Sequence, residues 1–184
     1  MTANICAHSL TKMLFYTTTT VVDWVDIFTR PRYMHIVVDS LRYCQEHKGL
    51  EIYAWVLMSN HLHMIIGTSG EQGVSEVFRD FKKFTSKQIV SQLTADEHES
   101  RREWMIDRFH FAAANDKKSK DYRFWQEGNH VEQLHTGTFF FQKLNYLHQN
   151  PVRKEIVAKA EDYLYSSARD YAGMKGLLDV IVVR

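Results

Sequence analysis

Two histidines stand inside an otherwise apolar run, AWVLMSNHLHMII, which covers residues 54–66. His61 and His63 are two positions apart, so on a β-strand both side chains project from one face, with Leu62 on the other. Two imidazoles at that separation suit a metal ion and leave the rest of its coordination shell open. Two histidines on a solvated sheet face are the plain alternative. The pair indicates a metal site only if other chemical groups converge on it.

A second set of polar residues lies in the run GTFFFQKLNYLHQNP, residues 137–151. At about 100° per residue, three apolar side chains should share the core face of a helix: Phe140, Leu144 and Leu147. Tyr146 lies away from that stripe, Asn150 lies one turn after it, and Lys143 lies about one turn before it. A helix with a polar face explains the same pattern. However, a tyrosine hydroxyl near a cation can also act as a covalent nucleophile, and a metal beside it could polarise a phosphate.

The pattern of apolar residues indicates which elements carry these groups. Residues rich in β-branched and aromatic side chains predict strands, at 13–24, 50–58, 61–67 and 124–134. Helical periodicity predicts helices, at 31–48, about 73–93 and 137–151. The first helix begins at Pro31 and stops at Gly49. Pro151 should end the last helix and hold Asn150 away from the α region.

The order β-α-β-β-α-(insertion)-β-α matches a ferredoxin-like or RRM-like α+β sandwich. In this fold class, helices pack on one face of an antiparallel sheet and the other face is free for a ligand. The histidine–tyrosine site is then expected between the sheet and the last helix. We expect one domain over residues 1–184, with a charged insertion at about 94–123 and a tail at about 174–184. The run GLLDVIVV, 176–183, could offer an edge to a partner or close the chain's own sheet.

The composition excludes several classes of protein. Hydrophobic residues make up 45% and charged residues 24%, as in ordinary soluble globular proteins. The net charge of +1 means that any site for a polyanion must be a local patch. Cys6 and Cys44 form neither a disulfide framework nor a zinc spacing, which favours a reducing compartment. Without an apolar stretch of about 18 residues or a signal-peptide pattern, we expect a cytoplasmic protein with no membrane partner.

Basic residues on the second helix are candidates for nucleic-acid contact. Its apolar face should contain five residues, Val74, Val77, Phe78, Phe81 and Phe84. The opposite face carries four basic ones, Arg79, Lys82, Lys83 and Lys87. Such a stripe is often only a solvated face, but it could contact backbone phosphates with a salt-dependent affinity. Arg153 and Lys154 could also reach phosphate, and Tyr122 and Trp125 are candidates for stacking on bases.

Four runs together resemble the HUH single-tyrosine transposases, and among them the REP-associated tyrosine transposases. They are WVLMSNHLHMII, FWQEGNH, LNYLHQNPVRKEIV and EDYLYSSARDY, and the resemblance covers roughly residues 13–173. A His-hydrophobic-His motif alone is weak. Its combination with a tyrosine four residues before Asn-Pro, and with a Tyr-x-Tyr-Ser-Ser run, is specific.

The resemblance implies cleavage and rejoining of single-stranded DNA at sites flanked by hairpins. It makes His61 and His63 ligands of Mg²⁺ or Mn²⁺ and Tyr146 the nucleophile, which leaves a 5′-phosphotyrosine link and a free 3′-hydroxyl. Relatives often place a glutamine one turn after the tyrosine as a third ligand, where this chain has Asn150. An asparagine keeps the carbonyl oxygen that a hard cation prefers, although imidazole ligands do not themselves select magnesium.

Two other functions stay open. The chain could be a domesticated relative that binds nucleic acid without catalysis, or a metal-dependent nuclease that uses water. The presence of His61, His63 and Tyr146 favours a transposase over a relative without catalysis. A covalent protein–DNA adduct would exclude a nuclease that uses water. The oligomeric state is also open, since some relatives are homodimers that exchange the tyrosine helix and others are monomers.

Overall fold

Residues 13–114, 121–128 and 130–184 are described in a computed structural model. Cys6 and part of the expected insertion lie outside these ranges. Four strands form one antiparallel sheet in the order β2-β3-β1-β4. They are β1 Leu14–Thr20, β2 Leu50–Leu57, β3 His61–Thr68 and β4 His130–Leu134. This is the predicted ferredoxin-like α+β sandwich, with β3 and β1 as its central strands.

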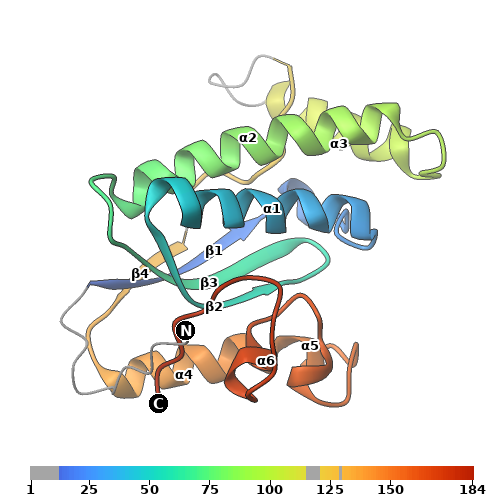
Figure 1. Cartoon of the computed structure of the whole chain (residues 1–184). Coiled ribbons are helices and arrows are strands. Elements are labelled where there is room, and N and C mark those ends of the chain that lie inside the picture. The colour runs from blue at the N-terminus through green and yellow to red at the C-terminus, as the bar shows by residue number, and fades with distance from the viewer. Residues whose placement is uncertain (1–12, 115–120, 129) are drawn as a thin grey trace.

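Helices cover both faces of the sheet (Figure 1). On one side lie α1 Pro31–Lys48 and α2 Val74–Ala95, with α3 Arg102–Ala114 beside α2. On the other side lie α4 Gly137–His148, α5 Asn150–Arg153 and α6 Ala168–Tyr171. The short 3₁₀ turns are η2 Val22–Trp24 and η3 Ala160–Asp162. The face expected to be free for a ligand is therefore partly covered, chiefly by α4. None of the helices in the described ranges is long and apolar enough to cross a bilayer.

Two apolar cores lie on the two sides of the sheet, because alternate strand residues point to opposite faces. The larger core joins the sheet to α1 and α2 and includes Trp55, Leu62 and Met64. The smaller core lies under α4 and includes Ala54, Val56 and Ile65, together with the three helix residues predicted to face it, Phe140, Leu144 and Leu147. The position of Tyr146 outside the apolar stripe is thereby confirmed.

The predicted first helix has the bounds that the sequence indicated. It begins at Pro31 and ends at Lys48, and Gly49 follows with φ of 65°. A Cβ atom on Gly49 would come within 2.6 Å of the Gly70 backbone nitrogen. Glycine is thus needed there both for the left-handed backbone and for the close approach of the loop after β3.

The strand predicted at 13–24 ends at Thr20, and Val22–Trp24 form a 3₁₀ turn instead. Three further details of the prediction were wrong. The strand expected at 124–134 is reduced to β4, because Phe124 and Trp125 turn into the larger core and only Trp125 forms a bridge, to Val21. Phe84 is 54% exposed. It lies on a groove of about 920 Å³ between α1 and α2 instead of in the core.

The third error concerns the end of the tyrosine helix. Asn150 is helical: α4 ends at His148, and a separate short helix, α5, begins at Asn150. Pro151 has no N–H to continue the ladder of α4, but its fixed φ suits the first turn of a new helix. Arg153 then bonds through its backbone N–H to the carbonyl of Gln149, at 2.9 Å.

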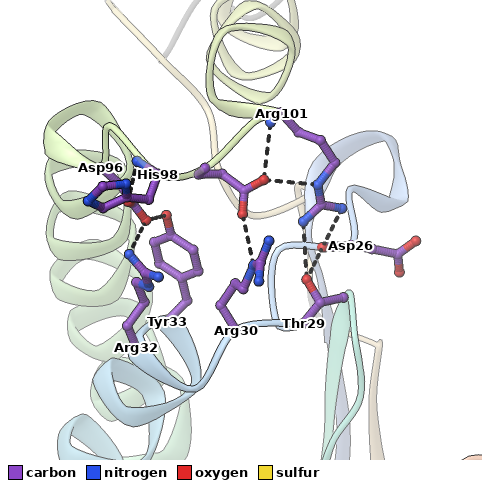
Figure 2. Close-up of polar contacts among 9 residues, drawn as sticks. Asp26, Thr29, Arg30, Arg32, Tyr33, Asp96, His98 and Arg101 are labelled. Carbon is purple, nitrogen blue, oxygen red and sulfur yellow. Dashed lines mark hydrogen bonds and ion pairs between the residues drawn. The ribbon is translucent and has the colours of Figure 1, made fainter.

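A polar brace ties the connection between α2 and α3 to the segment that enters α1 (Figure 2). The buried Asp96 carboxylate accepts from Arg32 Nη1 at 2.6 Å and from the Tyr33 hydroxyl at 2.8 Å. The buried Glu99 carboxylate accepts from Arg101 Nε at 3.1 Å. Arg101 in turn donates to the Asp26 carbonyl at 3.2 Å and the Thr29 hydroxyl at 3.1 Å. The brace therefore fixes the start of α3 against the loop that follows β1.

The C-terminal segment covers the β2 edge of the sheet. Ser166 bridges to Val56, and the Ile181 N–H donates to the Ile52 carbonyl at 2.9 Å. The run 176–183 thus packs on the chain's own sheet, which decides between the two roles considered for it. Covering an edge strand in this way also blocks its pairing with another chain.

Candidate active site

The histidine pair lies on the central strand β3, on the face that α4 crosses. His61 is opposite Thr20 and His63 is opposite Thr18 on β1. The ring centroids of the two histidines are 4.6 Å apart and their planes are inclined at 75°. His63 is buried and His61 is half-buried. The structure therefore places both imidazoles side by side, as their spacing predicted.

The side chain of Asn60 fixes the tautomer of His61. The Asn60 amide nitrogen donates to the Asp26 carboxylate and to the Trp24 carbonyl, each at 3.0 Å. The Asn60 oxygen lies 2.6 Å from Nδ1 of His61. Since an amide oxygen can only accept, Nδ1 of His61 carries the proton. Its Nε2 keeps a lone pair, which is the form that a metal ligand requires.

Two hydroxyls hold the ring of His63. Its Nδ1 lies 2.9 Å from the Tyr16 hydroxyl and 2.8 Å from the Thr18 hydroxyl. Burial, with a smaller contribution from the neighbouring His61, lowers the pKa of His63 to about 3. Burial also lowers the pKa of His61. Both rings are therefore neutral near pH 7, so both can offer a lone pair.

Tyr146 projects from α4 toward the histidines and is 46% exposed. Its ring centroid is 5.7 Å from that of His63, edge to face. The two rings line a cavity of about 490 Å³. The other side chains around this cavity are Tyr16, Thr18, Phe139, Gln142 and Lys143. An exposed phenol beside a neutral imidazole, in an open cavity, can meet an extended substrate.

One cation lies against the Tyr146 ring and a second lines the same cavity. The Arg153 guanidinium carbon lies 4.5 Å from the centre of the Tyr146 ring, and Arg153 Nη2 donates to the Tyr146 carbonyl at 2.7 Å. Lys143 Nζ lies 2.6 Å from a Glu132 carboxylate oxygen and 4.6 Å from the centre of the Tyr16 ring. Arg153 therefore adds positive charge beside the Tyr146 ring, whereas the Glu132 carboxylate offsets the charge of Lys143.

Asn150 lies one helical turn beyond Tyr146 and is buried. Its amide nitrogen donates to the Tyr146 carbonyl at 3.4 Å. This bond leaves the oxygen as the amide atom that could serve a cation. Asn150 is not among the residues that line the cavity.

The structure separates the basic residues into two groups. Lys154 lies near enough to His61 to lower its pKa, so it belongs with Arg153 beside the site. The basic residues of α2 lie across the sheet from Tyr146 (Figure 1). Of these, Arg79 pairs with Asp80, and Lys83 and Lys87 are exposed.

The remaining members of the predicted DNA surface are partly buried. Lys82 donates to the carbonyls of Gln126 at 3.1 Å and Gly128 at 3.5 Å, and burial lowers its pKa to about 8. Trp125 is 5% exposed and packs in the larger core, with Nε1 bonded to Thr85. The expectation that Trp125 offers its face to bases was therefore wrong.

Several residues of the site could not be found from the sequence. Asn60 directly precedes His61, and that adjacency was the only sequence signal for it. Asp26 and Tyr16 are remote in sequence and reach the histidines only through the loop after β1 and the register of β1 with β3. Gln142 lies one turn before Tyr146, on the same helix edge.

The residues fit an open metal site better than a closed one. In the part of the chain that the structure describes, no three side chains of the His, Cys, Asp and Glu types converge. A cation here would thus have two imidazoles and, beyond them, oxygen ligands from amides, substrate or water. Such an open coordination shell is the arrangement of catalytic rather than structural sites.

Comparisons with known proteins bear on the family and the fold. The sequence model of the family "Transposase IS200 like" matches residues 25–122, a little over half of the chain. A solved structure of a REP-associated tyrosine transposase bound to a REP hairpin is similar, with a TM-score of 0.60 and 18% identity over 90% of this chain and 83% of the other. A protein of Deinococcus radiodurans, named as a transposase candidate, aligns with a TM-score of 0.46 and 14% identity over 75% and 90% of the two chains.

No curated protein matches the sequence. The family match spans the histidine pair and the strands that carry it, and the similar solved structure shows the same fold around it. The chain therefore belongs to the IS200-like family of transposases.

Proposed function

We propose that this transposase cleaves and rejoins single-stranded DNA through a covalent bond to Tyr146, at sites flanked by hairpins. The observation that carries the proposal is the placement of Tyr146. Its side chain is half exposed in a cavity that opens to solvent. The centroid of its ring lies 5.7 Å from the centroid of the neutral His63 ring. A tyrosine needed only for packing would not require this exposure.

The reaction is a transesterification at phosphorus. The Tyr146 phenolic oxygen bonds to the scissile phosphate and loses its proton, and the bond from phosphorus to the 3′ oxygen breaks. That oxygen takes up a proton, so a free 3′-hydroxyl and a 5′-phosphotyrosine result. A 3′-hydroxyl of another strand can reverse the step and join new ends. Arg153 supports this chemistry because its guanidinium packs on the Tyr146 ring and donates to the Tyr146 carbonyl. It also adds positive charge near the phosphate.

His61 and His63 would hold a divalent cation, Mg²⁺ or Mn²⁺, with Asn150 as a third ligand through its amide oxygen. Such an ion polarises the phosphate and neutralises charge that develops in phosphoryl transfer. The chain's own contribution is the chemical form of the ligands. Asn60 keeps Nδ1 of His61 protonated, and burial keeps His63 neutral. Imidazole nitrogen ligands do not select between Mg²⁺ and Mn²⁺, so the metal that is bound depends on which of the two ions is available.

DNA would be held by two sets of cations. Arg153 and Lys154 would contact the phosphates next to Tyr146, which lies on the same side of the sheet. Arg79, Lys82, Lys83 and Lys87 would reach only DNA that extends around the molecule to α2, such as the arm of a hairpin. The similar solved structure, which is bound to a REP hairpin, supports a hairpin as partner. We propose one domain over 1–184, and a homodimer that exchanges the tyrosine helix remains an alternative arrangement.

The proposal is tested by incubating the protein with a single-stranded hairpin oligonucleotide and Mn²⁺. We expect a protein–DNA adduct that survives denaturation on a gel. Tyr146→Phe removes the attacking oxygen and should abolish the adduct. A nuclease that uses water would cut the DNA without leaving any adduct.

Two further variants serve as controls. His61→Ala should stop cleavage while DNA binding is largely retained, because the imidazole acts on the reacting phosphate. Phe141→Ala, an exposed α4 residue outside the cavity lining, should form the adduct normally. Adduct formation by Tyr146→Phe would show that the nucleophile is another residue.

A further inference from the structure

The backbone turns sharply directly after β1, at Asp23 and Trp24. Both residues have φ of 51°, in the left-handed region that is strained for residues other than glycine. Trp24 is nevertheless 66% exposed, so its own side chain gains no core packing from this conformation. Strain of this kind persists only where the surrounding structure enforces it, and it is concentrated at functional sites.

The bonds that enforce the turn also reach the histidine pair. The Val22 N–H donates to the Phe124 carbonyl at 2.9 Å, and the Asn60 amide donates to the Trp24 carbonyl at 3.0 Å. The same Asn60 side chain accepts from His61 at 2.6 Å. One amide thus joins the carbonyl of an exposed tryptophan to a candidate metal ligand. The backbone of Trp24 is thus held at the end of the sheet where His61 begins β3.

The outer face of α3 continues this exposed surface. Trp104, Arg108 and Phe111 are at positions i, i+4 and i+7, which share one side of a helix. Trp104 is 51% exposed and Phe111 is 59% exposed. The Arg108 guanidinium lies 5.4 Å from the centre of the Phe111 ring and 3.9 Å from the Asp23 carboxylate. Arg108 therefore links the face of α3 to the strained turn.

The core does not account for this pattern. The inner face of α3 already packs through Met105, Phe109 and Ala113. A helix on a protein surface normally has a polar outer face, so a second row of aromatic residues indicates an interaction site. The brace from Arg101 to the Asp26 carbonyl and Thr29 keeps the start of α3 beside the loop that contains the turn (Figure 2).

We propose that Trp24, extended by Trp104, Arg108 and Phe111, is a platform on which unpaired bases of the DNA stack where the strand passes from the histidine pair around the end of the sheet. This rests on the proposed function, because it places the platform along the path of the reacting strand. Exposed aromatic rings stack with any unpaired base, and an arginine between them can meet the connecting phosphate. A duplex hides the faces of its bases, so the platform is specific for single strands. The connection of the turn to His61 through Asn60 favours DNA over a protein as the occupant.

The test measures equilibrium binding by fluorescence anisotropy, with Tyr146→Phe protein so that no covalent product forms. The probe is a labelled single-stranded oligonucleotide of mixed sequence and about 20 nucleotides, longer than a typical site for one protein module. Trp24→Asn removes the ring, while asparagine tolerates the left-handed backbone. We expect its affinity to fall by about 5- to 100-fold, the range for loss of one stacked base. Trp24→Phe should retain most of the affinity, and binding of a blunt duplex should not change.

Phe84→Ala is the matched control, because Phe84 is a similarly exposed aromatic residue, 54%, on α2. It should bind the single strand as tightly as the parent. Equal affinity of Trp24→Asn and the parent would overturn the platform, even if the wild-type chain forms its adduct. Loss of self-association in Trp24→Asn, with DNA affinity unchanged, would overturn it in favour of a protein interface. Failure of the wild-type chain to form an adduct, with the effect of Trp24→Asn retained, would overturn the proposed function alone.

Discussion

At the scale of single residues, one amide side chain sets the tautomer of His61. Asn60 is oriented by two acceptors, Asp26 and the Trp24 carbonyl, and presents its oxygen to His61. We predict that Asn60→Ala lowers the affinity for Mn²⁺ by about 10- to 100-fold, as is usual when a partner that orients a ligand is lost. Isothermal titration calorimetry measures this directly.

The ¹⁵N NMR spectrum of the metal-free protein separates positioning from general damage to the fold. The wild-type spectrum should show His61 with its proton on Nδ1, and the Asn60→Ala spectrum should show a mixture of tautomers. Asp26→Asn keeps an oxygen that accepts from Asn60, so this variant should bind Mn²⁺ nearly as well as the wild type. Unchanged affinity in Asn60→Ala would contradict the assignment.

Residue types and spacing were enough to indicate the candidate reactive groups but not the residues that support them. His61, His63 and Tyr146 are visible because two imidazoles share a strand face and a phenol leaves an apolar helical stripe. The hydroxyl of Tyr16 depends on the register of β1 with β3, and the carboxylate of Asp26 depends on the course of a loop. Neither is encoded in a local pattern.

At the scale of elements, the run Tyr163–Ser167 connects the end of the tyrosine helix to the sheet. The Ser167 hydroxyl accepts from the Trp55 N–H at 2.9 Å and lies 2.9 Å from Nε2 of His148 in α4. Ser167→Ala would leave these buried groups without a partner, so we predict a loss of about 1–3 kcal/mol in unfolding free energy. Urea denaturation measures it. Ser166→Ala, which removes one acceptor for the Ala168 N–H, is the control and should cost less.

The brace between α1 and the α2–α3 connection predicts a dependence of stability on pH. The Tyr33 hydroxyl, the His98 N–H and Arg32 hold the pKa of Asp96 below its ordinary value. A lowered carboxyl pKa stabilises the fold above the unfolded value of about 3.9, and the stabilisation is lost as the pH falls through the folded value.

Asp96→Asn should therefore unfold at a lower temperature than the wild type at pH 7. The difference should shrink as the pH falls below about 4, because the Asp96 carboxyl then takes up a proton in the unfolded wild-type chain before it does so in the folded one. Thermal unfolding followed by circular dichroism at several pH values gives both curves. A difference that is constant across the whole range would mean that the charge of Asp96 does not contribute.

The order and type of the main elements followed from periodicity and turn residues, while their ends depended on packing. The first helix is bounded by Pro31 and Gly49, whose backbone preferences are local. The segment at 124–125 looks like a strand in sequence, but its aromatic residues are drawn into the core. The new helix at Asn150 arises because proline both stops one helix and starts the next.

At the scale of the whole molecule, the sheet separates the reactive phenol from most of the basic residues of α2. We predict that the double variant Lys83→Ala, Lys87→Ala forms the adduct normally with a short single strand. With a long hairpin, the slope of log affinity against log salt should fall by about 2, close to one unit for each lost phosphate contact. Arg153→Ala should weaken both adduct formation with the short strand and binding of the long hairpin. An unchanged salt slope for the double variant would mean that DNA does not reach α2.

The most direct test of the central claim is the polarity of the covalent bond. A hairpin oligonucleotide is labelled at its 5′ end in one sample and at its 3′ end in another, and each is incubated with protein and Mn²⁺. The account predicts that only the 3′ label stays with the denatured protein, that the 5′-labelled fragment is released with a free 3′-hydroxyl, and that mass spectrometry places the DNA on Tyr146. Retention of the 5′ label, or release of both labels without an adduct, would contradict it.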